Sequence, residues 1–391
     1  MKTSASAQNN LVWCFLEIFS CEGGIQSYVK DILEGYIALL TSESEAERLN
    51  LTSEILLLRD GADCPNPYSN SLIQFRYLKA NLPVIGRFRL ALELLQTLVT
   101  HRPKLVIAGH VNLSRLVQVL CRPLGVPYIV LTYGKEVWCP LPTKYRGALQ
   151  NAHQVWTISR YSRDIACKVN QLNPEKFRML PCAVDGDRFT PGSKPEPLIK
   201  RYDLQDAKVL MTVARLWSGD IYKGVDVTIR ALPEILHAFP NTKYLVIGRG
   251  DDQPRLAKLA EDLGISERVV FAGFVPTEEL VEHYRVADAY IMPSQEGFGI
   301  VYLEAMACGI PVLSGDADGS ADPLQDGRLG WQVPHRDPAA VAQACIEILK
   351  GEDQRCDGQW LRQESLIQFG RTGFQKQLGH LLRQAIEEAI V

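Results

Sequence analysis

The sequence predicts an α/β protein built from two doubly wound parallel sheets. Short, β-rich apolar runs alternate with longer stretches of helical periodicity, as parallel sheets covered by helices on both faces require. The alternation occurs twice, once on each side of a proline-containing stretch at residues 190–204 that is typical of a linker. At 391 residues the chain also exceeds what one hydrophobic core usually supports, so we expect two domains.

The elements follow one another in the order that such sheets need. In the first half the predicted strands are LVWCFLEIF (11–19), EILLL (54–58), KLVIAGH (104–110), PYIVLTYG (127–134) and QVWTIS (154–159), with helices at 25–40, 86–100 and 112–124. In the second half they are AKVLMTVAR (207–215), KYLVIG (243–248), RVVFAGF (268–274), DAYIMPS (288–294) and GIPVLSG (309–315). We assign 1–190 and 191–370 to two domains whose strand ends face each other across a ligand-binding cleft.

The composition is that of an ordinary soluble protein, with 46% hydrophobic and 22% charged residues. No apolar run approaches the roughly 18 residues of a membrane-spanning helix. The N-terminal stretch has no convincing signal-peptide cleavage site. The ten cysteines are scattered singly, without the spacing of metal ligands. Together these features indicate a cytoplasmic protein with reduced thiols and no zinc site.

Positive charge is concentrated in the first half of the chain. Residues 1–190 carry 21 Lys and Arg against 16 Asp and Glu, whereas residues 191–391 carry 21 against 29. Within segment 76–104 there are six basic residues and one Glu. Such a segment, rich in apolar residues, can lie against anionic lipid or bind an anionic substrate. A helix whose basic residues are simply solvated has the same pattern, so the sequence leaves both interpretations open.

Two glycine motifs follow predicted strands. Gly23 and Gly24 follow the first strand and open a helix, where backbone amides can approach an anion closely. Gly248 and Gly250 follow a strand of the second domain and could likewise admit a ligand. Each pair could also be only a tight turn. The first pair lacks the G-x-G-x-x-G pattern and the acidic residue of a dinucleotide site, so it gives NAD binding little support.

Two cations of the second domain suit a diphosphate ligand. Arg215 ends the first strand of this domain, and Lys223 precedes a helix. A guanidinium and an ammonium group at a cleft edge would stabilise the charge that develops when a diphosphate separates from a sugar. Two unrelated surface cations could have the same spacing.

The stretch SQEGFGIVYLEAMACGIPVL (294–313) contains two carboxylates at the mouth of an apolar helix. The turn at Gly297, Phe298 and Gly299 leads into a helix from Ile300 to Ala307, with Gly309 as its C-terminal cap. The amides at 298–301 are unpaired donors of this helix start. Glu304 needs hydroxyl partners, which a ribose offers, and Glu296 could bind sugar hydroxyls. Alternatively, Glu296 complements the helix dipole and Glu304 is a buried structural residue.

In the first domain, polar residues follow three predicted strands. They are His110, the loop with Tyr133, Lys135 and Glu136, and Ser159. His110 could hydrogen-bond a sugar hydroxyl or a phosphate, although a lone histidine after a strand often has no such role. Lys135 and Glu136 could position an acceptor, with Glu136 or a substrate oxygen taking its proton.

In combination, these motifs resemble the retaining GT-B glycosyltransferases of glycosyltransferase family 4 over nearly the whole chain. The residues that carry the resemblance occur in the family's order: Gly23-Gly24, Arg215, Lys223-Gly224, Gly248-x-Gly250, the AGFV strand end at 272–275 and the Glu296-x7-Glu304 motif. The resemblance implies Rossmann-like domains and a C-terminal helix, residues 371–391, that crosses back to the first domain.

The resemblance also implies a role for each donor-side residue. Arg215, Lys223 and the Gly23-Gly24 amides would bind the donor pyrophosphate, and Glu304 would bind ribose. Glu296 and the amides at 297–300 would bind the donor sugar. The base contact would be Val275, with Phe274 beside it. The remaining donor contacts would be Gly248 and Gly250, together with Gly297, Phe298, Gly299, Ile300 and Val301 at the helix start. Retaining transfer would proceed without a metal or other cofactor, through front-face attack assisted by the donor phosphate. We take Glu296, Arg215, Lys223 and His110 as the catalytic candidates.

The chain departs from the family pattern at two places. Tyr133 stands where the family often has a histidine, which makes His110 the better candidate for handling the acceptor together with Tyr133, Lys135 and Glu136. The stretch CAVD (182–185) keeps only Val184 and Asp185 of a motif that precedes the linker.

From family frequency we expect a UDP-sugar donor, with UDP-glucose first and a GDP-sugar as the other option. The acceptor would be a carbohydrate or a lipid-linked carbohydrate in polysaccharide or glycolipid synthesis. The protein would act in the cytoplasm or peripherally at the cytoplasmic face of the inner membrane, without nucleic acid. The alternatives are a nucleotide-sugar epimerase, for which the first domain lacks a convincing pair of acid/base carboxylates, and an inert partner subunit, which would have lost the donor residues.

Overall fold

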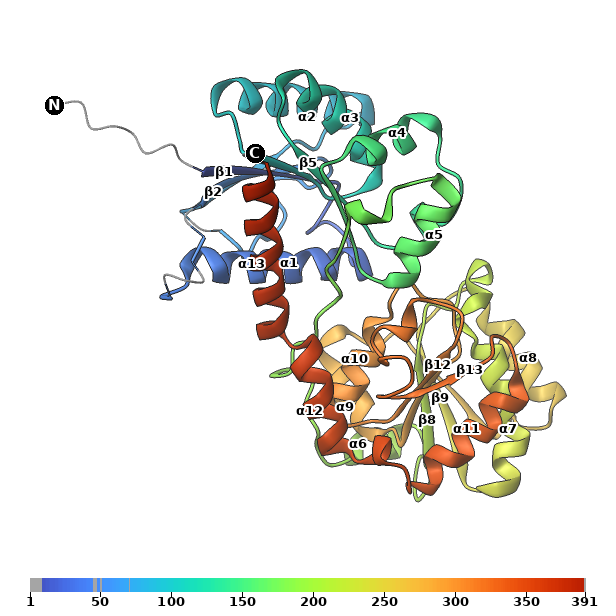
Figure 1. Ribbon diagram of the computed structural model, residues 1–391. Helices are drawn as coiled ribbons and strands as arrows, with labels where there is room; N and C mark the ends of the chain where they lie inside the picture. Colours follow the sequence, from blue (N-terminus) through green and yellow to red (C-terminus); the bar gives the residue numbers. More distant parts are fainter. Residues whose placement is uncertain (1–8, 45–47, 50, 70, 390–391) are drawn as a thin grey trace. The chain divides into compact units, whose positions relative to one another are not determined.

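The structure is a computed structural model that describes residues 9–44, 48–49, 51–69 and 71–389 (Figure 1). The chain divides into two compact units. One comprises the chain up to Cys182 together with the segment from Thr372 onward, and the other comprises Ala183–Arg371. Each unit contains one parallel sheet with helices on both faces, so the α/β class predicted from the sequence is confirmed.

The first unit has seven parallel strands in its described part, in the order β3-β2-β1-β4-β5-β6-β7. They are β1 (Asn9–Phe15), β2 (Leu51–Leu57), β3 (Ile73–Tyr77), β4 (Leu105–Ala108), β5 (Tyr128–Thr132), β6 (Gln154–Thr157) and β7 (Phe177–Met179). The order reverses between β1 and β4, which makes the sheet doubly wound. The edge strands β3 and β7 were not predicted, because β7 has only three residues and β3 mixes polar with apolar side chains.

Side chains of β1 alternate between two helical layers. Val12 and Cys14 belong to the core beneath α2 (Pro83–Thr100), α3 (Val111–Cys121) and α4 (Thr143–Asn151). On the opposite face, the ring of Trp13 lies 5.3 Å from that of Tyr36 in α1 (Gly24–Thr41), which packs beside α13 (Arg371–Glu388) (Figure 1). The remaining α-helix of this unit is α5 (Arg160–Asn170). Both faces of the sheet are therefore buried, as its almost uninterrupted apolar strands require.

The second unit has six parallel strands in its described part, in the order β10-β9-β8-β11-β12-β13. They are β8 (Lys208–Val213), β9 (Thr242–Ile247), β10 (Val269–Gly273), β11 (Ala289–Met292), β12 (Val312–Gly315) and β13 (Trp331–Val333). Its α-helices are α6 (Glu196–Arg201), α7 (Val225–Ala238), α8 (Gln253–Asp262), α9 (Leu280–Val286), α10 (Ile300–Ala307), α11 (Pro338–Lys350) and α12 (Gly358–Phe369). Helix α6 lies within the proline-containing stretch 190–204. Its proline is in the first turn, where a helix tolerates this residue.

The two ends of the second unit lie side by side. Val184, near its beginning, forms a parallel bridge with Gly370, near its end. The Val184 amide donates to the Phe369 carbonyl over 2.8 Å, and Arg371 pairs with Asp185 at 3.2 Å. Among the described residues of the whole chain, no helix combines the length and apolarity needed to cross a bilayer.

Candidate functional site

The polar residues of the second unit gather where its parallel strands end. Arg215 follows β8, Gly248 follows β9, Glu296 follows β11 and Asp318 follows β12. Because all these strands run in one direction, their carboxyl ends meet at a single edge of the sheet. This edge is where open α/β sheets bind ligands.

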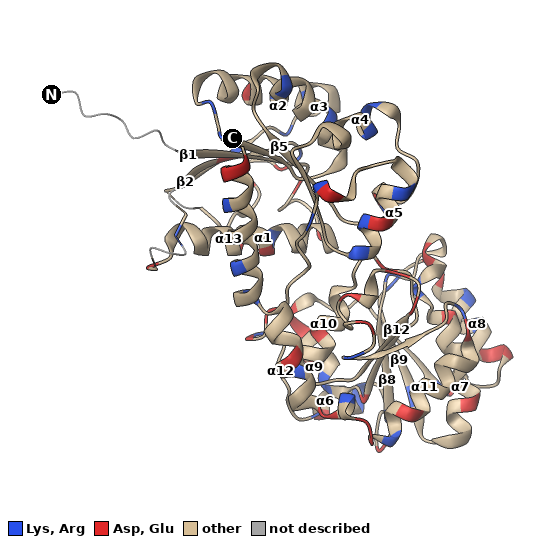
Figure 2. Cartoon of the chain, in the orientation of Figure 1, with Lys and Arg blue, Asp and Glu red and all other residues tan. Residues whose placement is uncertain are grey.

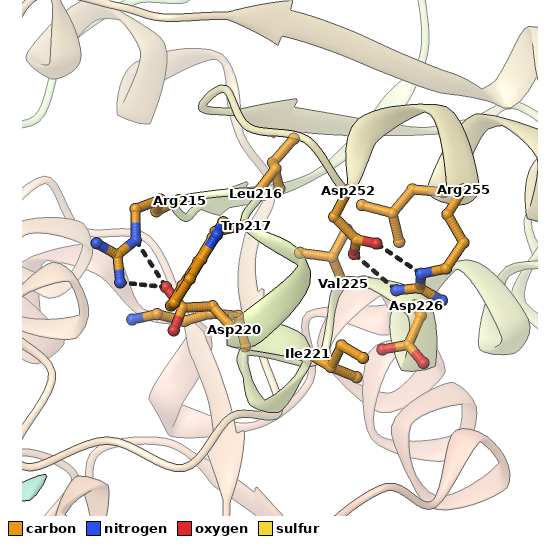
Figure 3. A pocket seen from close by; sticks show the side chains of 11 residues that line it. Arg215, Leu216, Trp217, Asp220, Ile221, Val225, Asp226, Asp252 and Arg255 are labelled. Atoms are coloured by element: carbon orange, nitrogen blue, oxygen red, sulfur yellow. Dashed lines mark hydrogen bonds and ion pairs between the residues drawn. The ribbon is translucent and has the colours of Figure 1, made fainter.

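Arg215 is held by a carboxylate that the sequence analysis did not identify. Its Nε donates to Asp220 over 2.7 Å, while 66% of its side chain stays exposed (Figure 3). Asp220 is buried in the 3₁₀ helix Ser218–Lys223, and its hydrogen bond raises the pKa of Arg215. Arg215 also lines a pocket of about 490 Å³ with Trp217, Arg249 and Gly250. A permanently charged, accessible guanidinium is thus fixed at the strand end.

The two glycines after β9 are needed for packing between loops. Gly248 has φ +136°, and a Cβ there would lie 1.8 Å from the Ala214 carbonyl oxygen. A Cβ on Gly250 would lie 1.8 Å from the carbonyl oxygen of Leu216. Both glycines therefore let the loop after β9 approach the loop after β8. The approach of these glycines to a ligand remains a prediction.

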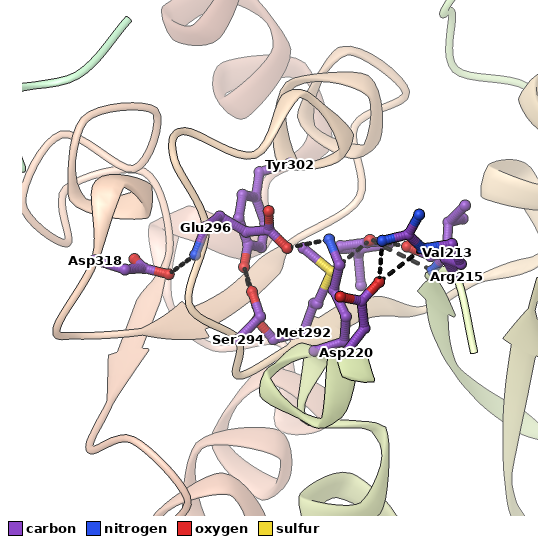
Figure 4. A network of polar contacts seen from close by, with 10 residues as sticks. Val213, Arg215, Asp220, Met292, Ser294, Glu296, Tyr302 and Asp318 are labelled. Carbon is purple, nitrogen blue, oxygen red and sulfur yellow. Dashed lines mark hydrogen bonds and ion pairs between the residues drawn. The ribbon is translucent and has the colours of Figure 1, made fainter. Parts of the chain in front are cut away.

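Lys223 and Glu296, both predicted from the sequence, form an ion pair in the structure. Lys223 Nζ donates to a Glu296 carboxylate oxygen, and their side chains are 21% and 16% exposed (Figure 4). A second contact joins the same loops, because the Gln295 amide donates to the Tyr222 carbonyl over 3.1 Å. The pair leaves both charges at the strand ends, partly screened from solvent.

Asp318, which sequence reasoning missed, fixes the backbone on either side of Glu296. One oxygen of its carboxylate accepts the Glu296 amide (Figure 4). The other oxygen accepts the Ser320 amide at 2.8 Å. The Gly319 amide donates to the Glu296 carbonyl over 2.9 Å. A Cβ on Gly319 would lie 2.0 Å from the Gly297 carbonyl oxygen, so this close contact requires glycine. The only sequence signal was a short polar loop, GDADGS, after a predicted strand.

The helix after Glu296 has the bounds expected from the sequence. It begins at Ile300 behind Gly299, which has φ +91°, ends at Ala307, and is followed by Gly309 with φ +77°. Phe298 is buried, with its ring 5.8 Å from that of Phe369, so its side chain belongs to the core. The backbone of Gly297 and Phe298 leads into the helix, and Ile300 and Val301 are its first two residues. We predicted that this segment binds the donor sugar.

Glu304 has a protein hydroxyl as its partner. The Tyr284 hydroxyl donates to its carboxylate over 2.7 Å. Burial raises the pKa of Glu304 to about 7, and the opposing effects of this hydrogen bond and of Arg188 are smaller. Glu304 therefore changes its protonation near neutral pH.

The predicted base contacts differ in their accessibility. Phe274 is 55% exposed, and the guanidinium carbon of Arg249 lies 4.8 Å from its ring centroid. Val275 is buried at 8% exposure. Of the two, only Phe274 presents a large side-chain surface.

In the first unit, Gly23 and Gly24 lie at the start of α1, and both are exposed. The chain that leads to them is held by Asp60, a buried residue that the sequence analysis did not single out. Its carboxylate accepts the amides of Ile18 at 2.7 Å and Ser20 at 2.8 Å. Asp60 thereby fixes the loop between β1 and the glycine pair.

His110 follows β4 and caps α3. Its Nδ1 accepts the Asn112 amide over 3.0 Å, so neutral His110 carries its proton on Nε2. Burial, with a smaller contribution from the Arg59 charge, lowers the pKa of His110 to about 4. The imidazole ring lies 6.0 Å from that of Tyr133. His110 is therefore a neutral hydrogen-bonding group at pH 7.

The loop after β5 lies beside His110 but uses most of its polar groups internally. The Tyr133 hydroxyl donates to the Gly109 carbonyl, and the Tyr133 amide donates to the Glu136 carboxylate. Burial raises the pKa of Glu136. Lys135 is exposed. In the described part of the chain, no group of three His, Cys, Asp or Glu residues is arranged to hold a metal ion.

The second unit is similar in sequence to known proteins. Residues 207–351 match the family model described as glycosyl transferases group 1. The GDP-mannose-dependent alpha-(1-6)-phosphatidylinositol monomannoside mannosyltransferase of Mycolicibacterium smegmatis is 37% identical over 245 residues, covering 59% of this chain. The chain spans 63% of the length of that mannosyltransferase.

Two solved structures have the same GT-B fold as this chain. Sucrose-phosphate synthase from Thermosynechococcus elongatus is 19% identical, with a TM-score of 0.73 over 97% of this chain and 100% of that one. The HepE protein of Anabaena, in complex with UDP, is 18% identical, with a TM-score of 0.73 over 96% and 100%. At these identities the likeness concerns the fold alone.

Proposed function

We propose that this protein is a retaining hexosyltransferase that moves a sugar from a nucleotide diphosphate to a carbohydrate or lipid-linked carbohydrate acceptor. The observation that carries the proposal is the set of groups at the strand ends of the second unit. Arg215 supplies a positive charge after β8, Lys223 supplies another through its pair with Glu296 just before α10, and Glu304 lies within that helix. These groups suit a diphosphate, a sugar and a ribose, in an enzyme without a metal cofactor.

The proposed donor is GDP-mannose. From the sequence alone we expected UDP-glucose, but the mannosyltransferase that is 37% identical depends on GDP-mannose. The complex of HepE with UDP belongs to a protein that is only 18% identical, so it carries little weight for the base. We therefore place GDP-mannose first and UDP-glucose second.

In the proposed reaction Lys223 changes its partner. When the donor binds, Lys223 turns from Glu296 to the diphosphate, and Glu296 becomes available to the sugar hydroxyls. The bond between the anomeric carbon and the β-phosphate oxygen breaks, and its electron pair stays on that oxygen. The acceptor oxygen forms the new bond on the same face of the sugar, and its proton passes to the leaving phosphate. Arg215 and Lys223 stabilise the charge that grows on the diphosphate.

The first unit would bind the acceptor. Neutral His110 can donate through Nε2 to an acceptor hydroxyl, since its Nδ1 is occupied by Asn112. Lys135 and Glu136 follow the neighbouring strand, and the amides at Gly23 and Gly24 would serve the donor phosphate. The acceptor of the mannosyltransferase relative is a phosphatidylinositol mannoside by name. A glycolipid acceptor is therefore favoured, with peripheral membrane contact through segment 76–104.

A thermal-shift titration with four ligands tests the proposal. We expect GDP and GDP-mannose to raise the melting temperature more than UDP and UDP-glucose, and this increase to disappear in Lys223→Ala. If the UDP ligands stabilise the protein more, the donor is wrong. If none of the four stabilises it, the proposed function itself is wrong. Turnover should persist in EDTA, and its loss would contradict a metal-independent reaction.

A further inference from the structure

Helix α2 carries apolar side chains on two faces. One face, with Leu90, Leu94 and Leu98, is buried in the core of the first unit. The other face is exposed to solvent. It consists of Val84 (73% exposed), Ile85 (43%), Phe88 (67%), Leu92 (55%), Leu95 (41%) and Val99 (58%), which we call the outer stripe. An ordinary surface helix would have polar residues here.

The outer stripe is continuous along the helix. At about 100° per residue, its six side chains fall within an arc of about 100° centred opposite the buried face. Of the 14 large apolar side chains that are exposed among the described residues, seven lie between Leu82 and Val99. The other seven are distributed over several other helices and loops. Exposed apolar residues that gather in this way mark a binding surface.

Basic residues border the outer stripe. Arg87 and Arg89 are exposed on its two sides, and Arg89 Nη1 donates to the Lys79 carbonyl over 3.1 Å. The neighbouring helix α3 adds exposed Arg115 and is followed by exposed Arg122. Residues 83–124 contain six Lys and Arg but a single carboxylate, that of Glu93. Lys and Arg are marked blue on this helical layer in Figure 2.

The charge and shape of this surface favour a bilayer as its occupant. A helix that lies in a membrane interface presents a row of Leu, Val or Phe to the acyl chains and Arg or Lys to the lipid phosphates. The outer stripe contains no polar side chain that a protein partner would have to pair. Its cationic border complements anionic headgroups.

We propose that α2 is an interfacial helix that docks the first unit on an anionic membrane surface. The outer stripe enters the boundary between headgroups and acyl chains, and Arg87 and Arg89 contact lipid phosphates. The proposal deepens the proposed function, on which it rests for the lipid-linked acceptor. It also favours lipid contact over simple solvation of segment 76–104, because the basic residues border an apolar surface that no other part of the described chain covers.

Flotation of the full chain with vesicles tests the docking. The vesicles contain either phosphatidylcholine alone or phosphatidylcholine with about one third phosphatidylglycerol. We expect the wild type to float with the anionic vesicles only. Phe88→Glu should lower the partition coefficient by about tenfold to a hundredfold, since it removes an aromatic side chain that would be buried in the bilayer. Arg87→Ala should lower it by about fivefold, the effect of one basic residue near the surface.

Two further variants keep the test specific. Ile367→Glu changes an apolar residue that is 59% exposed on α12 of the second unit, and it should leave flotation unchanged. Phe88→Trp keeps the apolar surface, and its fluorescence should shift to shorter wavelength when anionic vesicles are added. Equal flotation of Phe88→Glu and wild type, or no shift of the tryptophan emission, would overturn the proposal.

The same samples distinguish docking from catalysis. The GDP-dependent increase in melting temperature should be equal in wild type and Phe88→Glu. If GDP stabilises the protein but vesicles do not bind it, only the docking is wrong. If vesicles bind it but no nucleotide stabilises it, only the proposed function is wrong. A wild-type dimer that Phe88→Glu converts to a monomer, without vesicle binding, would assign the outer stripe to a second copy of the chain.

Discussion

The strand ends of the two units use opposite electrostatic arrangements. In the second unit, Arg215 and Lys223 each hold a carboxylate partner. In the first unit, burial shifts the pKa of both His110 and Glu136 toward the neutral form. A site that keeps paired cations is suited to exchange one anion for another, whereas a site with neutral groups is suited to hydroxyls. The difference supports a phosphate-containing ligand in the second unit and an uncharged one in the first.

The largest expected effect is the loss of a cation in the second unit. Lys223→Ala or Arg215→Ala should lower kcat with GDP-mannose by about two to three orders of magnitude, because each removes a group that stabilises the leaving diphosphate. Lys258→Ala is the matched control, since Lys258 is an exposed cation of α8 paired with Glu261 and Asp262. Activity of Lys223→Ala within threefold of wild type would contradict a role for Lys223 in stabilising the leaving diphosphate.

The next effect concerns nucleotide binding by Glu304. Glu304→Ala should abolish the increase in melting temperature that GDP causes, because the ribose would lose its acceptor. An unchanged increase would show that Glu304 is only a structural partner of Tyr284. The measurement needs no acceptor and therefore tests the second unit alone.

The role of Glu304 also predicts how GDP affinity depends on pH. The pKa of Glu304 is raised to about 7, and its ionised form is the better acceptor, so GDP affinity should rise between about pH 6 and pH 8. For the free protein the sign is opposite. A raised carboxyl pKa contributes stability that is present below the usual value of about 4.5 and is lost as pH rises through about 7. Glu304→Gln should flatten both profiles.

A smaller effect is expected in the first unit. His110→Ala should lower acceptor-dependent turnover by about five- to tenfold, the effect of losing one hydrogen bond. It should leave the GDP-dependent melting temperature unchanged, because His110 would bind only the acceptor. His110→Gln, which can still donate from its amide, should recover part of the activity. Equal losses of acceptor turnover and GDP stabilisation would contradict separate roles for the two units.

The smallest effect should come from Asp318. Asp318→Asn should raise the KM for GDP-mannose by about threefold, because a neutral amide is a weaker acceptor for the Glu296 backbone than a carboxylate. Stabilisation by GDP alone should be unchanged, since the Asp318 contact positions Glu296 rather than the nucleotide. A purely structural role would instead lower the melting temperature without changing KM.

Much of this molecule could be predicted because the signals are local. Strand runs, the bounds of α10 and the residues that end strands follow from apolar periodicity and from glycine positions. That Glu296 follows a strand and that Lys223 precedes a helix could also be predicted, although their ion pair could not. Asp60 and Asp318 were missed because each binds backbone amides that only the folded chain brings close. Asp220 is only five residues from Arg215, but their contact depends on the local 3₁₀ helix, which was not predicted. The buried states of Phe298 and Tyr133 likewise depend on neighbours that are remote in sequence.

The exposed face of helix α2 could not be predicted from the sequence either. Its basic residues were evident in the sequence, but apolar residues at 84–99 fit either a buried helix or an exposed one. Only the structure separates the residues that pack on the sheet from those of the outer stripe.

The bridge between Val184 and Gly370 brings the two ends of the second unit together, so this unit could be exchanged as one piece. Residues 183–371 form an insertion within the sequence of the first unit. The two ends of this insertion are adjacent in space. Segments with neighbouring ends tolerate grafting and circular permutation well. Recombination could therefore replace the second unit while the first unit stays intact. If the second unit binds the donor as proposed, an enzyme lineage could acquire a new donor in this way and keep the acceptor site of its first unit.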